Sequence, residues 1–280
     1  MRLWVLLFSL LTVTAQPALS ATSPALASLE RQLASIAATQ NGDVGIAALD
    51  LKTGESVSIN GSEPFPMAST VKVAIAANYL AQVEYGRRSL DDVIAGRSAR
   101  RLMEAMMIHS DNHATDLLLR NLGGPRTIQA WVSQTALSGM RVDRTIAQLL
   151  RDRRDLYDVR DSSTPLAMVE LLRRIDAAQL LKVDSRNYLL DLMGRCVTGR
   201  NRIRGMLPFG TPVQNKTGTL NGLSTDVGFI TLPDGRRVAI AVFARHGSDR
   251  SRTIAEAART VYYGLYQAMT QRAGLLLSTH

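Results

Sequence analysis

The spacing of hydrophobic residues changes along the chain from alternating to helical and back again. Residues 29–38 have apolar positions at helical spacing, and residues 44–51 and 55–59 read as two strands around a turn at residues 52–54. From residue 70 to 174 the spacing predicts mainly helix, at residues 71–85, 99–108, 114–121, 125–135 and 165–175. Strands follow at residues 213–219, 225–232 and 237–244, before a last helix over residues 252–271. Strands therefore bracket a helical middle.

The two groups of strands are expected to form one sheet, because an isolated hairpin is only marginally stable. The fold class is therefore α/β, of the α+β kind, with an antiparallel sheet flanked by the terminal helices and a separate all-helical lobe. We assign residues 22–65 and 207–280 to the α/β lobe and residues 66–206 to the helical lobe. A ligand site is expected in the cleft between the two lobes.

Residues 1–21 have the features of a cleaved secretory signal peptide. Arg2 is followed by an apolar run over residues 3–13 and by small residues at 18–21. A membrane anchor is the alternative, but the run is shorter than the ~20 residues that span a bilayer. The mature protein is expected to be periplasmic or secreted, without a stable membrane anchor.

Composition narrows the function without assigning one. The chain has 280 residues and a net charge of +9, but its basic residues are scattered rather than gathered in a stripe with aromatics, so no nucleic-acid partner is expected. Cys196 is the only cysteine and cannot form an internal disulfide, and we interpret it as structural. We expect a monomer. Lysine is scarce, which makes a lysine in a motif informative; the lysines are Lys52, Lys72, Lys182 and Lys216.

The first motif that can carry chemistry is Ser69-x-x-Lys72, at the start of a predicted helix. A spacing of three is nearly one helical turn, so the hydroxyl and the ammonium project from one face. Serine becomes a good nucleophile when a neighbouring base takes its proton, and a lysine shielded from water and near another cation can act as that base. The alternative is a helix-capping serine beside an unrelated lysine.

Two further motifs accompany this pair. Ser110-Asp111-Asn112 falls in a tight turn between two predicted helices, where a second hydroxyl could pass on a proton and an amide could hold a substrate carbonyl, although plain helix capping is an alternative. Lys216-Thr217-Gly218-Thr219 lies on a predicted strand, where Gly218 would allow close approach of a ligand and Lys216 would attract an anion. The triplet at residues 52–54 repeats Lys-Thr-Gly, but in a hairpin turn, where we expect no chemistry.

In this order and at these separations, the three motifs resemble those of class A β-lactamases and their penicillin-binding relatives. The resemblance covers essentially the mature chain. Arg144 and Asp161 are similar to the pair that closes the neck of the family's Ω loop. The resemblance implies a β-lactamase-like fold with the serine between the lobes, and a small-molecule substrate, either a β-lactam or a D-Ala-D-Ala peptide. It implies neither a cofactor nor a metal.

The resemblance also implies a role for each motif residue. Ser69 would attack the lactam carbonyl, with Lys72 as a candidate base, and Ser110 would relay the proton to the lactam nitrogen. Asn112 would bind the amide side chain of the substrate. Lys216, Thr217 and Thr219 would hold its carboxylate, and the backbone N–H groups of Ser69 and Thr219 would form the oxyanion hole.

One part of the family pattern is missing. Class A enzymes place a glutamate shortly after the arginine of the Ω loop, where it activates the water that hydrolyses the acyl-enzyme. Ile146 stands at that position, Leu150 stands where an asparagine would help to hold the water, and there is no glutamate between Arg144 and Asp161. We therefore expect acylation on Ser69 followed by slow deacylation, or deacylation by another carboxylate such as Asp152.

Three functions remain open at this point, namely a divergent β-lactamase, a DD-peptidase or esterase, and a non-catalytic penicillin-binding protein that is acylated once. The β-lactamase ranks first because every recognition motif suits that substrate. Metal binding by His109 and His113 is a fourth possibility, disfavoured because no adjacent acidic ligand completes a site.

Overall fold

The computed structural model describes residues 24–153 and 155–278, with side chains described up to residue 268. The expected signal peptide lies outside these ranges. Within them, no helix is both long enough and apolar enough to cross a membrane.

A five-stranded antiparallel sheet forms the centre of the fold, in the order β2-β1-β9-β8-β7. Its strands are β1 (Gly42–Asp50), β2 (Ser56–Ile59), β7 (Val213–Leu220), β8 (Leu223–Thr231) and β9 (Arg237–His246). Residues 238–245 of β9 are all buried, because both faces of the sheet are covered. Alternate residues of β9 serve different cores: Ala239, Ala241 and Phe243 face one, and Val238, Ile240 and Val242 the other.

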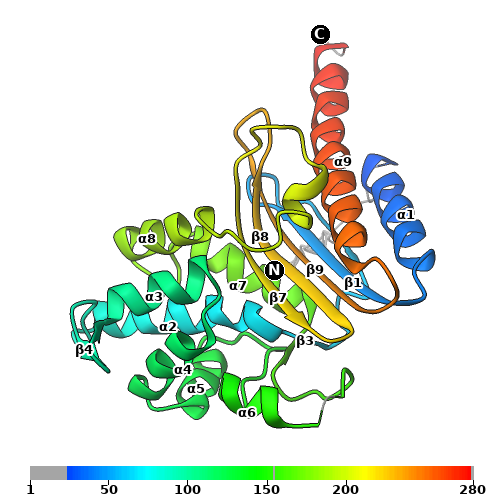
Figure 1. The fold of residues 1–280 in the computed structure, drawn as a ribbon. Coiled ribbons are helices and arrows are strands. Elements are labelled where there is room, and N and C mark those ends of the chain that lie inside the picture. Colours follow the sequence, from blue (N-terminus) through cyan, green and yellow to red (C-terminus); the bar gives the residue numbers. More distant parts are fainter. Residues whose placement is uncertain (1–23, 154, 279–280) are drawn as a thin grey trace, which may run out of the picture.

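Figure 1 shows α1 and α9 side by side on one face of the sheet and the middle of the chain on the other. The flanking helices are α1 (Pro24–Ala38) and α9 (Arg250–Ser278). The helices of the middle are α2 (Lys72–Glu84), α3 (Ala99–Ile108), α4 (Asn112–Asn121), α5 (Pro125–Gln134), α6 (Ile146–Arg151), α7 (Pro165–Asp176) and α8 (Val183–Gly194). Among them, α7 packs directly on β1 and β9.

Short elements complete the connections. They are the 3₁₀ helices η1 (Ala68–Val71) and η2 (Ile203–Met206) and the two-residue strands β3 (Phe65–Pro66), β4 (Val93–Ile94), β5 (Arg97–Ser98) and β6 (Ser162–Ser163). The β3–β6 pair links the segment before η1 to the segment before α7. Helix α2 is buried over its first ten residues, as expected for a helix that is apolar on nearly all sides. It fixes η1, which directly precedes it, at the edge of the sheet.

The expected fold class is confirmed. Each predicted helix and strand has an observed counterpart, but α1 begins at residue 24 rather than 29 and α9 ends at residue 278 rather than 271. Helices α6 and α8 were not predicted. The pattern Leu189-Leu190-Asp191-Leu192-Met193 buries all its apolar members in α8, but it is too short to distinguish a helix from a strand by spacing alone.

Candidate active site

Ser69 lies in η1, one turn before Lys72 begins α2, and its side chain is half-buried. The backbone around it is held tightly. Ala68 has φ of 49°, a left-handed conformation that is unfavourable for a residue with a Cβ. On the other side of Ser69, the Thr70 hydroxyl donates to Met67 O at 2.7 Å. The position of Ser69 is therefore set by the surrounding structure rather than by local preference.

Lys72 joins the first motif to the second. Its fully buried ammonium donates to Ser110 O at 2.7 Å, to Ser110 Oγ at 3.1 Å and to Asn112 Oδ1 at 2.8 Å. Ser110 also has a left-handed backbone, with φ of 59°. Asp111 caps α4 by accepting from Ala114 N, so capping is the role of Asp111 and the Ser110 hydroxyl is left for the two lysines.

Lys216 brings in the third motif. Its Nζ, also fully buried, donates to Ser110 Oγ at 3.0 Å and to Thr217 O at 2.8 Å. Two ammonium groups therefore meet at one hydroxyl, although 106 residues separate Ser110 from Lys216. The structure thus brings together Lys72, Ser110, Asn112 and Lys216, with Ser69 one turn from Lys72.

Burial and neighbouring charges lower the pKa of both lysines. The pKa of Lys72 falls to about 7, mainly because burial disfavours the charged form and also because Lys216 repels it; the charges of Asp111 and Asp116 oppose this effect. The pKa of Lys216 falls to about 8, again mainly through burial. Near neutral pH, a large share of Lys72 is the free amine that could accept a proton, while most of Lys216 stays charged.

Gly218 places β7 directly against the segment that carries Ser69. A Cβ on Gly218 would lie 2.7 Å from Met67 O and 3.0 Å from the Ala68 Cβ, so any side chain there would push the two segments apart. On either side of it, the Thr217 hydroxyl lies 2.5 Å from that of Thr198, and the Thr219 hydroxyl accepts from Arg202 at 2.7 Å.

Arg202 and Asp226 were missed by the sequence reasoning. The buried Arg202 guanidinium donates to Gly218 O at 2.7 Å and to Thr225 O at 3.0 Å, which fixes the end of β7 that bears the motif. Asp226 lies opposite Thr217 on β8 and accepts from Asn215 Nδ2 at 2.8 Å. Burial raises its pKa to about 7. A carboxylate directly before the apolar residues Val227-Gly228-Phe229-Ile230 was the signal that could have found it.

The structure brings Arg144 and Asp161, the predicted pair at the neck of an Ω loop, into direct contact. Arg144 Nε lies 2.6 Å from Asp161 Oδ2, and Asp161 also accepts from the backbone N–H groups of Asp143 and Arg144. Arg144 forms a further ion pair with Asp152 at 2.8 Å. The Asp152 carboxylate is therefore occupied by an arginine at the neck.

The position of the missing glutamate is apolar. The Ile146 side chain is buried and belongs to the hydrophobic core, while Leu150 is 49% exposed. The backbone N–H groups of Ile146 and Ala147 donate to the buried carboxylate of Asp116, at 2.8 and 2.9 Å. The sequence did not single out Asp116, although it stands as an acidic residue in the otherwise apolar run of α4.

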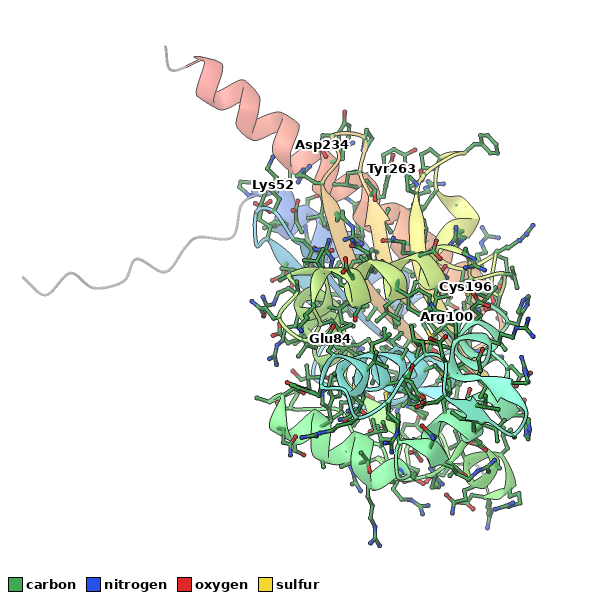
Figure 2. The ribbon with its side chains drawn as sticks, turned by 90° about the vertical axis from the view of Figure 1, so that its left-hand side faces the viewer. Lys52, Glu84, Arg100, Cys196, Asp234 and Tyr263 are labelled. Atoms are coloured by element: carbon green, nitrogen blue, oxygen red, sulfur yellow. The ribbon has the colours of Figure 1, made fainter. Side chains whose placement is uncertain are left out.

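The remaining residues considered from the sequence lie elsewhere or have other partners. His109 and His113 are exposed, and the described part of the chain holds no cluster of three or more potential metal ligands. Cys196 is buried, with its Sγ 3.3 Å from Thr198 Oγ1. Lys52 is remote: Figure 2 shows it beside Asp234, at the end of the sheet away from Cys196.

Comparison with known proteins decides the family. The sequence profile of the β-lactamase enzyme family matches residues 28–265. The chain belongs to the β-lactamase enzyme family. It is 30% identical to the extended-spectrum β-lactamase PER-1 of Pseudomonas aeruginosa over 276 residues, which cover 87% of this chain and 88% of that protein. It is also 30% identical to the carbapenem-hydrolysing β-lactamase KPC of Klebsiella oxytoca, over 80% of this chain and 84% of the relative.

Solved structures of this family agree with the fold. A variant of the last common ancestor of class A β-lactamases of Gram-negative bacteria superposes with a TM-score of 0.81 at 32% identity, over 86% of this chain and 99% of the other. A β-lactamase from Chitinophaga pinensis gives 0.80 at 29% identity, over 85% and 99%. The protein is thus a serine hydrolase of the class A β-lactamase type.

Proposed function

We propose that β-lactams acylate this protein on Ser69, and that the acyl-enzyme is hydrolysed slowly. The observation that carries the proposal is the Ser110 hydroxyl shared by two buried ammonium groups, one of which belongs to Lys72, one turn after Ser69 in the chain. The β-lactamase relatives support a β-lactam over a D-Ala-D-Ala peptide or a simple ester as the substrate. The predicted leader supports export to the periplasm or the medium, where we propose that the protein is a monomer.

In the acylation step, neutral Lys72 takes the proton of the Ser69 hydroxyl as Oγ bonds to the lactam carbonyl carbon. The carbonyl oxygen becomes an oxyanion, which the N–H groups of Ser69 and Thr219 would bind. When the C–N bond breaks, Ser110 gives its proton to the lactam nitrogen and regains one from the ammonium of Lys72.

Charged Lys216, with Thr217 and Thr219, holds the substrate carboxylate, while Asn112 binds the amide side chain.

Deacylation adds water to the ester carbon, breaks its bond to Oγ and returns a proton to Ser69. This step needs a base that activates the water, and Ile146 supplies none. Asp152 is paired with Arg144, so we place no base there. Loss of a positioned base lowers a rate by about 10²–10⁴-fold, which makes a long-lived adduct the expected outcome.

The direct test is to mix the protein with a stoichiometric amount of a penicillin and to follow its intact mass. We expect the mass to rise by that of one penicillin within seconds to minutes, and the adduct to decay much more slowly than it forms. Protein that neither gains the adduct nor consumes a chromogenic cephalosporin would contradict the proposed function.

The rate of acylation is expected to depend on pH as a narrow bell. Lys72 must be neutral to accept the proton, so the rate rises as pH increases through about 7; Lys216 must be charged to hold the carboxylate, so the rate falls above about 8. Since both lysines contact one hydroxyl, the two apparent pKa values belong to the pair. The measurement is the second-order acylation rate constant from pH 5 to pH 10.

The control for this profile is Lys216→Arg. Arginine stays charged over this whole range, so the alkaline limb is expected to disappear while the acid limb remains near pH 7. If the rate of Lys216→Arg still falls above about pH 8, the group that titrates there is not Lys216.

A further inference from the structure

Arg245 anchors the Ω loop at Leu156 and Tyr157, in addition to the ion pairs at the neck of the loop. Arg245 lies near the end of β9 and is only 3% exposed. Its Cζ lies over two aromatic rings, 3.9 Å from the ring centroid of Tyr157 in the Ω loop and 4.6 Å from that of Phe65. Arg245 donates to Leu156 O at 3.2 Å and to Pro64 O at 3.1 Å. One side chain thus ties the Ω loop to the segment that leads into Ser69.

Carboxylates complete this anchor. Arg245 Nε lies 2.8 Å from Asp43 Oδ2, which also accepts from the Tyr157 hydroxyl at 3.0 Å, and Glu63 pairs with the other end of the guanidinium. A buried arginine with two carboxylates and two carbonyl acceptors has little freedom to move. The backbone at Leu156 and Tyr157 is therefore held at a fixed place relative to β1 and β9.

The residue fixed in this way is Leu156, whose side chain packs against Ala68, the residue before Ser69, and is called the apolar plug below. The Leu156 side chain is 7% exposed and forms a small cluster with Ala68 and Leu223, against which Leu220 packs. A Cβ on Gly222 would lie 3.0 Å from Leu156 Cδ1, so the β7–β8 turn closes on the same side chain. Leu156 also lines a cavity of about 740 Å³. It therefore borders both this cavity and the residue that precedes Ser69.

We infer that Arg245 is a positioning residue that holds Leu156 against the Ala68 segment, and that this apolar plug keeps water away from the acyl group on Ser69. The inference rests on the proposed function, since it concerns the lifetime of the acyl-enzyme. Exclusion of water by a closed site prevents hydrolysis of a reactive intermediate. The plug and the missing base would therefore both slow hydrolysis of the acyl-enzyme. The plug limits the access of water, and without the base no group activates a water that does enter.

The test uses Leu156→Ala, which opens the plug, and Arg245→Gln, which releases its anchor. In both variants, acylation by a penicillin is expected to stay within about threefold of wild type, while decay of the adduct quickens about tenfold. The readout is the intact mass of the acylated protein against time. Adduct lifetimes equal to or longer than that of wild type in both variants would overturn the inference.

Matched controls separate this effect from loss of stability. Arg236 is also 3% exposed and pairs with Asp50 and Asp234, at the distant end of the sheet marked by Lys52 and Asp234 in Figure 2. Arg236→Gln is expected to lower the melting temperature without shortening the adduct lifetime. Leu232→Ala, in the core on the α9 side of the sheet, is the matched control for Leu156→Ala.

A second readout does not depend on acylation. Amide hydrogen exchange over residues 65–70 is expected to quicken in Leu156→Ala and Arg245→Gln, but not in Arg236→Gln, because only the first two remove a contact to this segment. The Thr70 hydrogen bond to Met67 and the buried helix α2 remain and keep Ser69 in place for acylation. If wild-type protein forms no adduct, the proposed function fails; unchanged exchange in the two site variants would then overturn the positioning role as well. If the adduct forms but its lifetime does not change, only the inference fails.

Discussion

Ser69→Ala is expected to abolish the penicilloyl adduct and to lower β-lactam turnover by about 10⁴-fold or more, because the ester is proposed to form on the Ser69 hydroxyl. The half-buried hydroxyl lies at the start of a helix whose packing does not depend on it, so thermal unfolding should remain close to that of wild type. The measurements are the intact mass after mixing with a penicillin and the initial rate with a chromogenic cephalosporin.

The matched control is Ser133→Ala on the exposed face of α5, which makes the same chemical change away from the site. It should leave both the adduct and the turnover unchanged. An adduct of one penicillin on Ser69→Ala would show that a different residue is acylated, and the assignment of the nucleophile would then be wrong.

The sheet and the main helices could be predicted because their apolar residues follow one period over many positions. Residues 237–244 are almost continuously apolar because the two faces of β9 pack into two different hydrophobic cores. The site residues at 69, 72, 110 and 216 could be predicted because each lies in a short motif in which residue types and spacing are both restrictive. Three motifs in the right order are far more specific than any one of them.

The supports of the site could not be predicted in the same way. Arg202 donates to backbone carbonyl groups of β7 and β8, and a pattern of side-chain types does not reveal such contacts. Arg245 contacts residues up to 202 positions away in the sequence. Asp116 meets the start of α6 only because α4 and α6 pack together. Such contacts depend on the tertiary arrangement. For Asp116 and Arg245 the sequence did offer a signal, because each is a charged residue at the end of an apolar run, which is costly to bury unless it is paired.

The absence of the Ω-loop glutamate was visible in the sequence, but its structural consequence was not. Ile146 does not simply leave a gap: its side chain joins the core, and its backbone is capped by Asp116. Leu156, which no motif includes, occupies apolar space next to Ala68 instead. In the proposed mechanism, the missing base and the packing of Leu156 on Ala68 would both prolong the lifetime of the acyl-enzyme.

Lys72→Met is expected to slow acylation by about 10²–10⁴-fold while the protein still folds. Methionine fills much of the same volume, but it removes the amine that would take the Ser69 proton and the hydrogen bonds to Ser110 and Asn112. Lys52→Met, the same change at an exposed site remote from Ser110, is the control and should acylate at the wild-type rate. The measurement is the second-order acylation rate constant near pH 7.5; a Lys72→Met rate within threefold of wild type would mean that another group accepts the proton of Ser69.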